Sequence, residues 1–303
     1  MVTATSQRCD SIEKISFDQY ATAFLDILGF KEFMQKVERS GSEEFHAFCE
    51  LQVVIGKQLE FISDDGQEQH LFPADVQLTL LHISDSFVLS APMSPGGRPG
   101  YSGLVAVAIK AIQLAHQLLR MGFLLRGGIA VGPVYRTTNN IFGTGYQDAF
   151  ETESKLARMP RVLLHKSAVA ALEGGVHSGF PMRLLSIFMK EADDYILDTL
   201  NSHWSYIGDN RDCDVLGIFN AYKMKIEKAL LELPAGEPRE KWKWMADLFE
   251  AKCQSSNDLR SIVPIRTNKS GFIFGQNDNQ NTIFKEAFVP FIRPSKRYVI
   301  NGH

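Results

Sequence analysis

Residues 24–30 read Phe24-Leu25-Asp26-Ile27-Leu28-Gly29-Phe30, an apolar strand with one carboxylate and a following glycine. A lone acid among large apolar residues costs free energy unless it is paired. Gly29 lets the chain turn into a helix that we expect to begin near Lys31. Asp26 either binds a metal ion at the strand end or accepts hydrogen bonds from the exposed amides of that helix. The stretch alone leaves both interpretations open.

A second acid is predicted at another strand junction. Val76–Ile83 and Phe87–Ala91 are rich in apolar residues, and Ser84-Asp85-Ser86 between them is typical of a tight hairpin turn. Further along, Phe123–Tyr135 has the pattern of a strand with glycines inside it. Interior glycines indicate a bulge or the close approach of another backbone or a ligand.

The elements around these three stretches predict an α+β fold, with helices over one sheet, related to the ferredoxin-like arrangement. One strand is expected at Arg161–His165. The expected helices lie at 31–39, 45–62, 101–121, 149–156 and 166–172.

The region beyond Gly174 has a looser pattern. Tyr195–Leu200 is expected as an edge strand, and Val215–Leu233 and Arg239–Lys252 as helices. The polar tail from Asn268 is a strand arm, a dimer contact or a mobile segment, and the sequence does not decide among these. We expect a core domain over residues 1–180 and an extension over 181–303, which packs on the core or on a dimer interface.

Composition narrows the class of protein. The net charge of −3 over 303 residues gives no broad attraction to nucleic acid or to anionic membranes. The four cysteines are far apart and include no CxxC pair, so reduced thiols and a cytoplasmic location are expected. The N-terminal residues have no uninterrupted apolar segment typical of a signal peptide, and we expect no apolar run to approach the length needed to span a bilayer.

Asp26 and Asp85 together form a candidate metal site. Carboxylate oxygens suit Mg²⁺ or Mn²⁺, and two such acids can hold a pair of ions against a triphosphate. The ions would polarise the α-phosphate and neutralise the leaving pyrophosphate. The backbone amides of Ile27, Leu28, Gly29 and Phe30, at the start of the expected helix, are candidates to bind the β- and γ-phosphates.

Three motifs in order resemble class III nucleotide cyclases. FLDILGF (24–30) is similar to the family's F-x-D-I-x-G-F signature, ISDSFVL (83–89) to its G-D-x-x-F hairpin, and LRGGIAVGPVY (125–135) to its R-x-G-I-x-x-G-x-V strand. An ordered set is far more specific than a single short match. The resemblance implies that Asp26 and Asp85 bind the metal ions, with the Ile27 carbonyl as a further ligand. It also implies a head-to-tail homodimer with active sites at its interface.

Departures from the family pattern concern the base and the transition state. Purine-specific members carry lysine or glutamate four residues before the hairpin aspartate, where this chain has Leu81. The family's V-N-x-A-x-R helix, which supplies an asparagine and an arginine, is missing. Lys155, Arg126 or a residue of the C-terminal region is a candidate for the missing positive charge, and we include Arg126 among the expected substrate-binding residues.

This combination resembles the pyrimidine cyclases of the Pycsar antiphage systems. The resemblance implies conversion of UTP or CTP to the 3′,5′-cyclic monophosphate, which activates a separate effector. UTP is placed only slightly ahead of CTP, because both bases fit a smaller pocket and no residue in the sequence reads the exocyclic group that distinguishes them. A purine cyclase with a rearranged pocket, and a non-catalytic nucleotide-binding module of the same fold, remain as alternatives.

Overall fold

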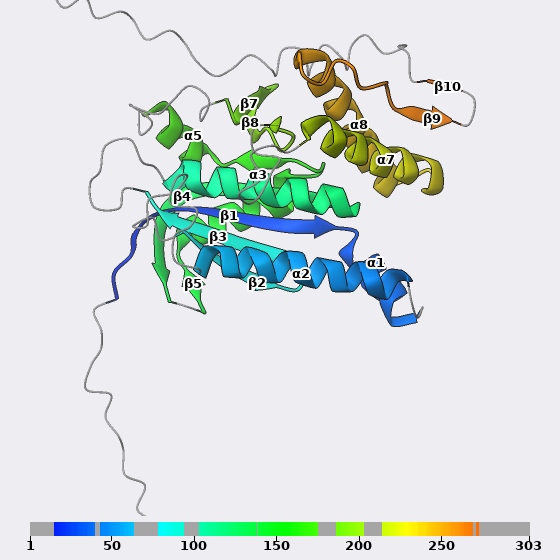
Figure 1. Cartoon of the computed structure of the whole chain (residues 1–303). Coiled ribbons are helices and arrows are strands. Elements are labelled where there is room, and N and C mark those ends of the chain that lie inside the picture. Colours follow the sequence, from blue (N-terminus) through cyan, green and yellow to red (C-terminus); the bar gives the residue numbers. More distant parts are fainter. Residues whose placement is uncertain are drawn as a thin grey trace, which may run out of the picture.

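The computed structural model of the chain describes residues 15–39, 43–63, 78–93, 103–137, 139–174, 186–202, 214–268 and 271–272. In these residues, one mixed sheet carries helices on both faces, which confirms the expected α+β class (Figure 1). Most of the polar tail lies outside the described residues. At its start, β9 (Arg266–Asn268) pairs with β10 (Gly271–Phe272) in a separate two-stranded sheet.

Four strands form a ferredoxin-like core. The strands β1 (Asp18–Leu28), β2 (Thr79–Ile83), β3 (Ser86–Pro92) and β4 (Leu124–Arg136) lie in the order β2-β3-β1-β4. Each neighbouring pair is antiparallel, so β1 and β2 are parallel with β3 between them. Helices α1 (Phe30–Arg39) and α2 (Glu43–Ser63) follow β1, and α3 (Gly103–Met121) joins β3 to β4.

The sheet continues beyond β4 with strands from later in the chain. β6 (Val162–Leu164) runs parallel to β4, and β8 (Asp194–Leu197) and β7 (Phe188–Glu191) follow it, while β5 (Ile141–Phe142) pairs with the end of β4. The strand expected at Tyr195–Leu200 is present as β8, but its expected position at the sheet edge is wrong, because β7 pairs with its outer side. β7 is too short to show an alternating pattern in the sequence. The domain boundary at residue 180 stays a prediction.

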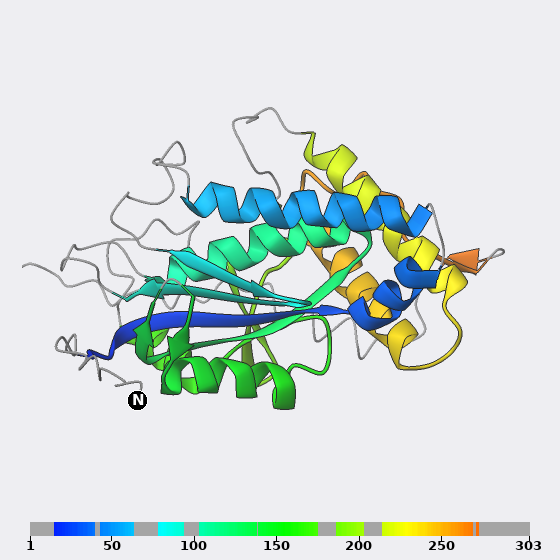
Figure 2. The same ribbon diagram turned by 90° about the horizontal axis from the view of Figure 1, so that it is seen from below.

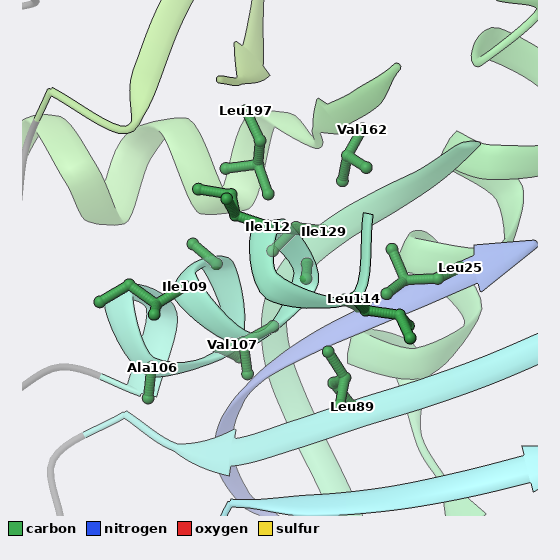
Figure 3. Packing of buried hydrophobic residues seen from close by; sticks show 14 of the residues in the cluster. Leu25, Leu89, Ala106, Val107, Ile109, Ile112, Leu114, Ile129, Val162 and Leu197 are labelled. Carbon is green, nitrogen blue, oxygen red and sulfur yellow. The ribbon is translucent and has the colours of Figure 1, made fainter. Parts of the chain in front are cut away.

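One face of the sheet packs on α3 in a continuous apolar core (Figure 3). Successive strand residues point to opposite faces, and Ala23, Leu25 and Ile27 of β1 are at most 2% exposed on this face. Figure 3 shows Leu25, Leu89 and Ile129 from three strands gathered around residues of α3. Burial of these side chains against one helix fixes the register of the strands, because a one-residue slip would turn them to the other face.

Helix α3 corrects one expectation from the sequence. It is long and apolar enough to cross a membrane by length and composition alone, with a mean hydropathy of 1.3 over its most apolar window. However, 83% of that window is buried inside the protein. The apolar character of α3 therefore matches its position between the sheet and the helices around it.

The opposite face carries α4 (Thr144–Glu151) with the π-helical turn η2 (Thr152–Leu156), as Figure 2 shows. Helices α7 (Val215–Glu232) and α8 (Glu237–Ser255) pack on each other at one end of the sheet, where α7 also contacts α3. Helix α5 (Lys166–Glu173) follows β6. The expected start of a helix at Ala149 is wrong, since α4 begins at Thr144. Gly145 has low helix propensity, but a Cβ there would lie 3.0 Å from the Gly132 oxygen of β4. The close crossing of α4 over β4 explains why glycine occupies that helix.

Candidate functional site

Asp26 lies near the end of β1, where the chain turns into α1. The turn requires Gly29, whose φ of 80° lies in the left-handed region. The Phe33 amide then donates to the Gly29 carbonyl at 3.1 Å and continues the first turn of α1. The sequence prediction of a glycine turn between strand and helix is therefore confirmed.

The hairpin between β2 and β3 brings Asp85 next to this strand end. Asp85 lies in a two-residue turn with Ser84, whose φ is 59°. The Ile27 amide donates to the Asp85 carbonyl at 2.9 Å, and Asp26 pairs with Ser86 in the ladder. The two acids singled out in the sequence are thus held beside each other by backbone hydrogen bonding.

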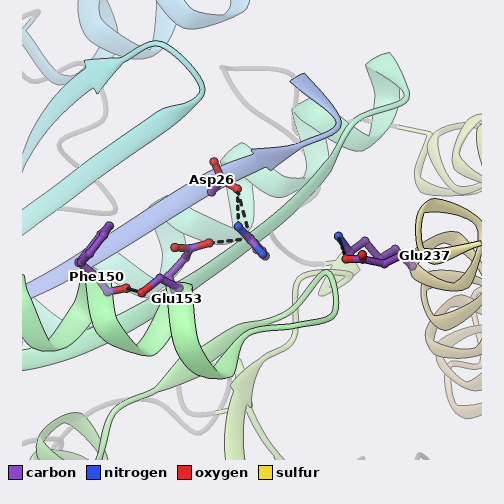
Figure 4. Close-up of polar contacts among 7 residues, drawn as sticks. Asp26, Phe150, Glu153 and Glu237 are labelled. Atoms are coloured by element: carbon purple, nitrogen blue, oxygen red, sulfur yellow. Dashed lines mark hydrogen bonds and ion pairs between the residues drawn. The ribbon is translucent and has the colours of Figure 1, made fainter. Parts of the chain in front are cut away.

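Arg126 joins Asp26 to a third acid. It is opposite Asp26 on β4, and its Nε and Nη2 atoms each lie 3.1 Å from Asp26 Oδ2. Its Nε atom also lies 2.5 Å from Glu153 Oε1 in η2. Figure 4 shows Asp26 and Glu153 near each other, with dashed lines for their contacts to this guanidinium. The Asp26 and Glu153 side chains are only 16% and 4% exposed, so solvent screens the cluster weakly.

Gly128 and the π-helical turn position Glu153. A Cβ on Gly128 would lie 2.4 Å from the Ala149 oxygen and 2.6 Å from the Thr152 Cβ. Only glycine therefore allows α4 and η2 to approach β4 so closely. The Ala157 amide donates to the Thr152 carbonyl at 3.1 Å, the spacing of a π turn. Such turns occur frequently at functional sites.

Burial and like charge make both carboxylates hard to ionise. The pKa of Asp26 is raised by burial, while Arg126 opposes the shift and the Asp85 charge adds to it. The pKa of Glu153 is also raised by burial, against the effect of Arg126, with Asp26 adding to the rise. The cluster therefore has more negative charge than its one arginine satisfies, and it is suited to attract a further cation.

The donor set at the strand end fits a hard divalent cation. The carboxylates of Asp26 and Asp85 and the backbone carbonyl of Ile27 are oxygen ligands of the kind that Mg²⁺ and Mn²⁺ prefer. Among the described residues no group of three His, Cys, Asp or Glu side chains forms a metal-binding cluster. A site at Asp26 and Asp85 would thus depend on two carboxylates completed by the backbone, water or substrate.

The other predicted site residues have varied surroundings. The Ile27 amide donates to the Asp85 carbonyl, and the phosphate-binding role of Ile27, Leu28, Gly29 and Phe30 stays a prediction. Leu81 is half-buried on β2, in the same cross-strand row as Val88 and Phe24. Lys155, a candidate for the missing charge, forms an exposed ion pair with Glu151 and is not part of the cluster.

Glu153 is a site residue that the sequence reasoning missed. Its helical segment was expected, but its inward orientation depends on the π turn and on contact with Gly128 of a distant strand. The only signal in the sequence was an interior glycine on β4, which indicated that some backbone approaches there.

Comparisons with known proteins do not identify the family of the chain. No family model and no curated protein matches the chain. Solved structures similar to the chain include the catalytic core of a rhodopsin-guanylyl cyclase with converted specificity in complex with ATPαS, and the monomeric guanylyl cyclase domain of the RhoGC fusion protein from the aquatic fungus Blastocladiella emersonii. Each is 14% identical with a TM-score of 0.36, over 60% of this chain and 96% of the other. A likeness this distant does not define the chain's family or function.

Proposed function

We propose that the chain is a metal-dependent nucleotide cyclase that converts UTP to 3′,5′-cyclic UMP and pyrophosphate. The observation that carries this proposal is the position of Asp26 beside Asp85, fixed by the hydrogen bond from the Ile27 amide to the Asp85 carbonyl. Three cyclase-like motifs in the family's order support it. The ferredoxin-like strand order is compatible with that resemblance.

The proposed reaction is an in-line displacement. The ribose 3′-oxygen forms a bond to the α-phosphorus, the bond from that phosphorus to pyrophosphate breaks, and the hydroxyl proton passes to solvent. Mg²⁺ or Mn²⁺ bound by Asp26 and Asp85 would neutralise charge on the phosphates and lower the pKa of the attacking hydroxyl. The amides at the start of α1 bind phosphate oxygens, and Arg126 supplies a cation beside them.

A homodimer is part of the proposal. The face that carries Asp26 also carries Ile83, opposite Ser86 in the ladder, and Phe150, which packs edge-on against Phe24. Their exposed fractions are 68% and 43%. Large apolar side chains around a polar site favour cover by another protein surface. A second copy would supply that cover and would bring the base pocket of one chain to the metal site of the other.

The pyrimidine preference depends on Leu81. This position offers the base no hydrogen-bonding group, and the resemblance to pyrimidine cyclases favours UTP, with CTP next. From the same resemblance we propose that the product is a second messenger that acts on a separate effector in antiphage defence in the cytoplasm.

The substrate is identified by incubating the protein with ATP, GTP, CTP and UTP separately in the presence of Mn²⁺. We expect pyrophosphate and cyclic UMP from UTP, with less product from CTP. Preferential turnover of ATP or GTP would overturn the pyrimidine assignment and would favour a purine cyclase with a rearranged pocket.

A non-catalytic nucleotide-binding module is the second candidate function. It is favoured by the two contacts of Arg126 with Asp26, which place a protein cation on the carboxylate that a metal ion would use. This alternative predicts saturable nucleotide binding with no release of pyrophosphate from any of the four nucleotides.

A further inference from the structure

Asp26 lies on the face of the sheet that α4 and η2 cover, and Figure 4 shows Glu237 of α8 facing this cluster. Phe24, Asp26 and Leu28 point to this face because strand residues alternate. Phe24 contacts Tyr146 and Phe150 of α4, whereas Leu28 packs against an apolar cluster that includes residues of α7 and α8. Asp26, whose side chain is 16% exposed, lies between these two contacts along β1.

The start of α8 carries a pair of oppositely charged side chains, Glu237 and Lys241. Lys241 Nζ lies 2.7 Å from Glu237 Oε1, and the two side chains are 17% and 80% exposed. Figure 4 shows Glu237 on α8 across from Asp26 and Glu153. Trp242 and Trp244 pack against the same apolar cluster as Leu28 and fix this part of α8 on the core.

The charges of this pair and of the Asp26 cluster affect each other. The pKa of Glu237 is lowered mainly by its hydrogen bond and charge interaction with Lys241, and Arg126 lowers it further. The pKa of Asp26 is raised by burial, and Lys241 is among the charges that oppose that rise. Lys241 is thus within electrostatic range of the carboxylate that we assign to the metal.

We propose that Lys241 binds the terminal phosphates of the nucleoside triphosphate substrate, and that Glu237 holds Lys241 in place until the substrate displaces it. This inference rests on the proposed function and assigns a substrate-binding role to the C-terminal extension. In this proposal a triphosphate whose α-phosphate lies at Asp26 extends its terminal phosphates toward the start of α8. Because Glu237 is 80% exposed, solvent weakens its ion pair with Lys241, and a multivalent phosphate can replace Glu237 as the partner of Lys241.

Other cations in the structure have different surroundings. Lys155 pairs with Glu151 on the surface, and Lys252 pairs with the buried Asp198. Lys241 combines a mostly buried side chain with a highly exposed partner, Glu237, which faces the Asp26 cluster in Figure 4. A fixed lysine whose anion is readily exchanged is suited to bind a phosphate group that arrives and leaves with each turnover.

The test is the affinity of the full chain for inorganic tripolyphosphate, measured by calorimetry with Mn²⁺ present. We expect Lys241→Gln to weaken binding about tenfold, because a charge-assisted hydrogen bond is lost. Glu237→Gln should strengthen binding about two- to fivefold, because it removes the competing carboxylate. Lys241→Arg should retain most of the affinity. The matched control is Lys228→Gln, which breaks an exposed pair with Glu232 on α7 and should leave affinity unchanged.

The outcomes separate this inference from the proposed function. Equal affinity of the wild-type chain and Lys241→Gln, or no tripolyphosphate binding by the wild-type chain, would overturn the role of Lys241. If Lys241→Gln weakens and Glu237→Gln strengthens tripolyphosphate binding, but the wild-type chain makes no cyclic nucleotide from any of the four triphosphates, the phosphate site stands and the proposed cyclase activity is refuted. Retained melting temperatures in all variants exclude unfolding as the cause of a change in affinity.

Discussion

Asp26 is costly to ionise in its surroundings. Its side chain is mostly buried, Asp85 adds a like charge, and Arg126 is shared with Glu153. A residue selected for stability alone would be apolar or fully paired at this position. The local cost therefore favours a functional role for Asp26.

We expect Asp26→Asn to remove metal binding without loss of stability. Asparagine keeps the shape and an oxygen that accepts from Arg126, but it removes a buried charge. The free energy of unfolding without metal should be unchanged or about 0.5–1 kcal/mol higher at pH 7. Mn²⁺ should raise the melting temperature of the wild-type chain but not of the variant. Denaturant and thermal unfolding with and without Mn²⁺ measure both effects, and a variant that Mn²⁺ still stabilises would contradict the assignment.

The same substitution should change the pH dependence of stability. Because the pKa of Asp26 is raised in the folded chain, the folded state binds the proton more tightly than the unfolded state. The Asp26 contribution to stability is full below the unfolded pKa near 3.8 and is lost as the pH rises through the folded pKa. Asp26→Asn should lack this loss, which urea unfolding at a series of pH values will detect.

The element that positions the site is the glycine-rich strand β4 under α4 and η2. Gly132 meets Gly145, and Gly128 meets the backbone of α4 and η2 at Ala149 and Glu153. These contacts set the height of η2 above the sheet and therefore the distance from Glu153 to Arg126. The approach requires the absence of a side chain on β4.

We expect Gly128→Ala to destabilise the protein by about 1–3 kcal/mol, because its Cβ has no space beneath η2. The metal affinity should also fall. If Glu153 is displaced, Arg126 pairs with Asp26 only and competes more strongly with a metal ion for that carboxylate. Gly56→Ala on α2 is the matched control, because nothing lies within 4 Å of the added Cβ. It should stabilise the chain by about 0.5–1 kcal/mol. Equal stability of Gly128→Ala and wild type in urea unfolding would refute the packing role.

Elements with strong local patterns were predictable, and contacts between distant elements were not. The strand at residues 24–28, the Ser84–Asp85 turn and the long helix at 101–121 follow from apolar periodicity and turn residues. The start of α4 could not be predicted in this way, because Gly145 has low helix propensity and is placed there by its close contact with Gly132 of β4. Glu153 and Lys241 lie far in sequence from Asp26, and no local pattern brings them to it.

At the scale of the whole molecule, buried polar contacts attach the C-terminal helices to the core. His116 of α3 lies 2.8 Å from the Tyr222 hydroxyl of α7 and 3.0 Å from the Asn201 carbonyl. Burial lowers the pKa of His116 to about 4, so the ring is neutral at pH 7. The ion pair between Lys252 of α8 and Asp198 adds a second connection. These contacts attach α7 and α8 to the core.

We expect Tyr222→Phe to destabilise the chain by about 1–3 kcal/mol, because a buried ring nitrogen of His116 loses its partner. Core and C-terminal helices should still unfold in one transition, since they share an apolar cluster. Circular dichroism and fluorescence during urea unfolding test this, with the partly exposed Tyr135→Phe as control. Separate transitions in the wild-type chain would contradict the joint packing.

We propose that Asp26 and Asp85 form the metal site of a nucleotide cyclase. The most direct test is the release of pyrophosphate and cyclic nucleotide from UTP as Mn²⁺ is titrated, for the wild-type chain, Asp26→Asn and Asp85→Asn. We predict Mn²⁺-dependent product from the wild-type chain and a loss of at least about 10³-fold in either variant. Undiminished turnover in a folded Asp26→Asn variant, or no cyclic product from the wild-type chain with any nucleoside triphosphate, would contradict the claim.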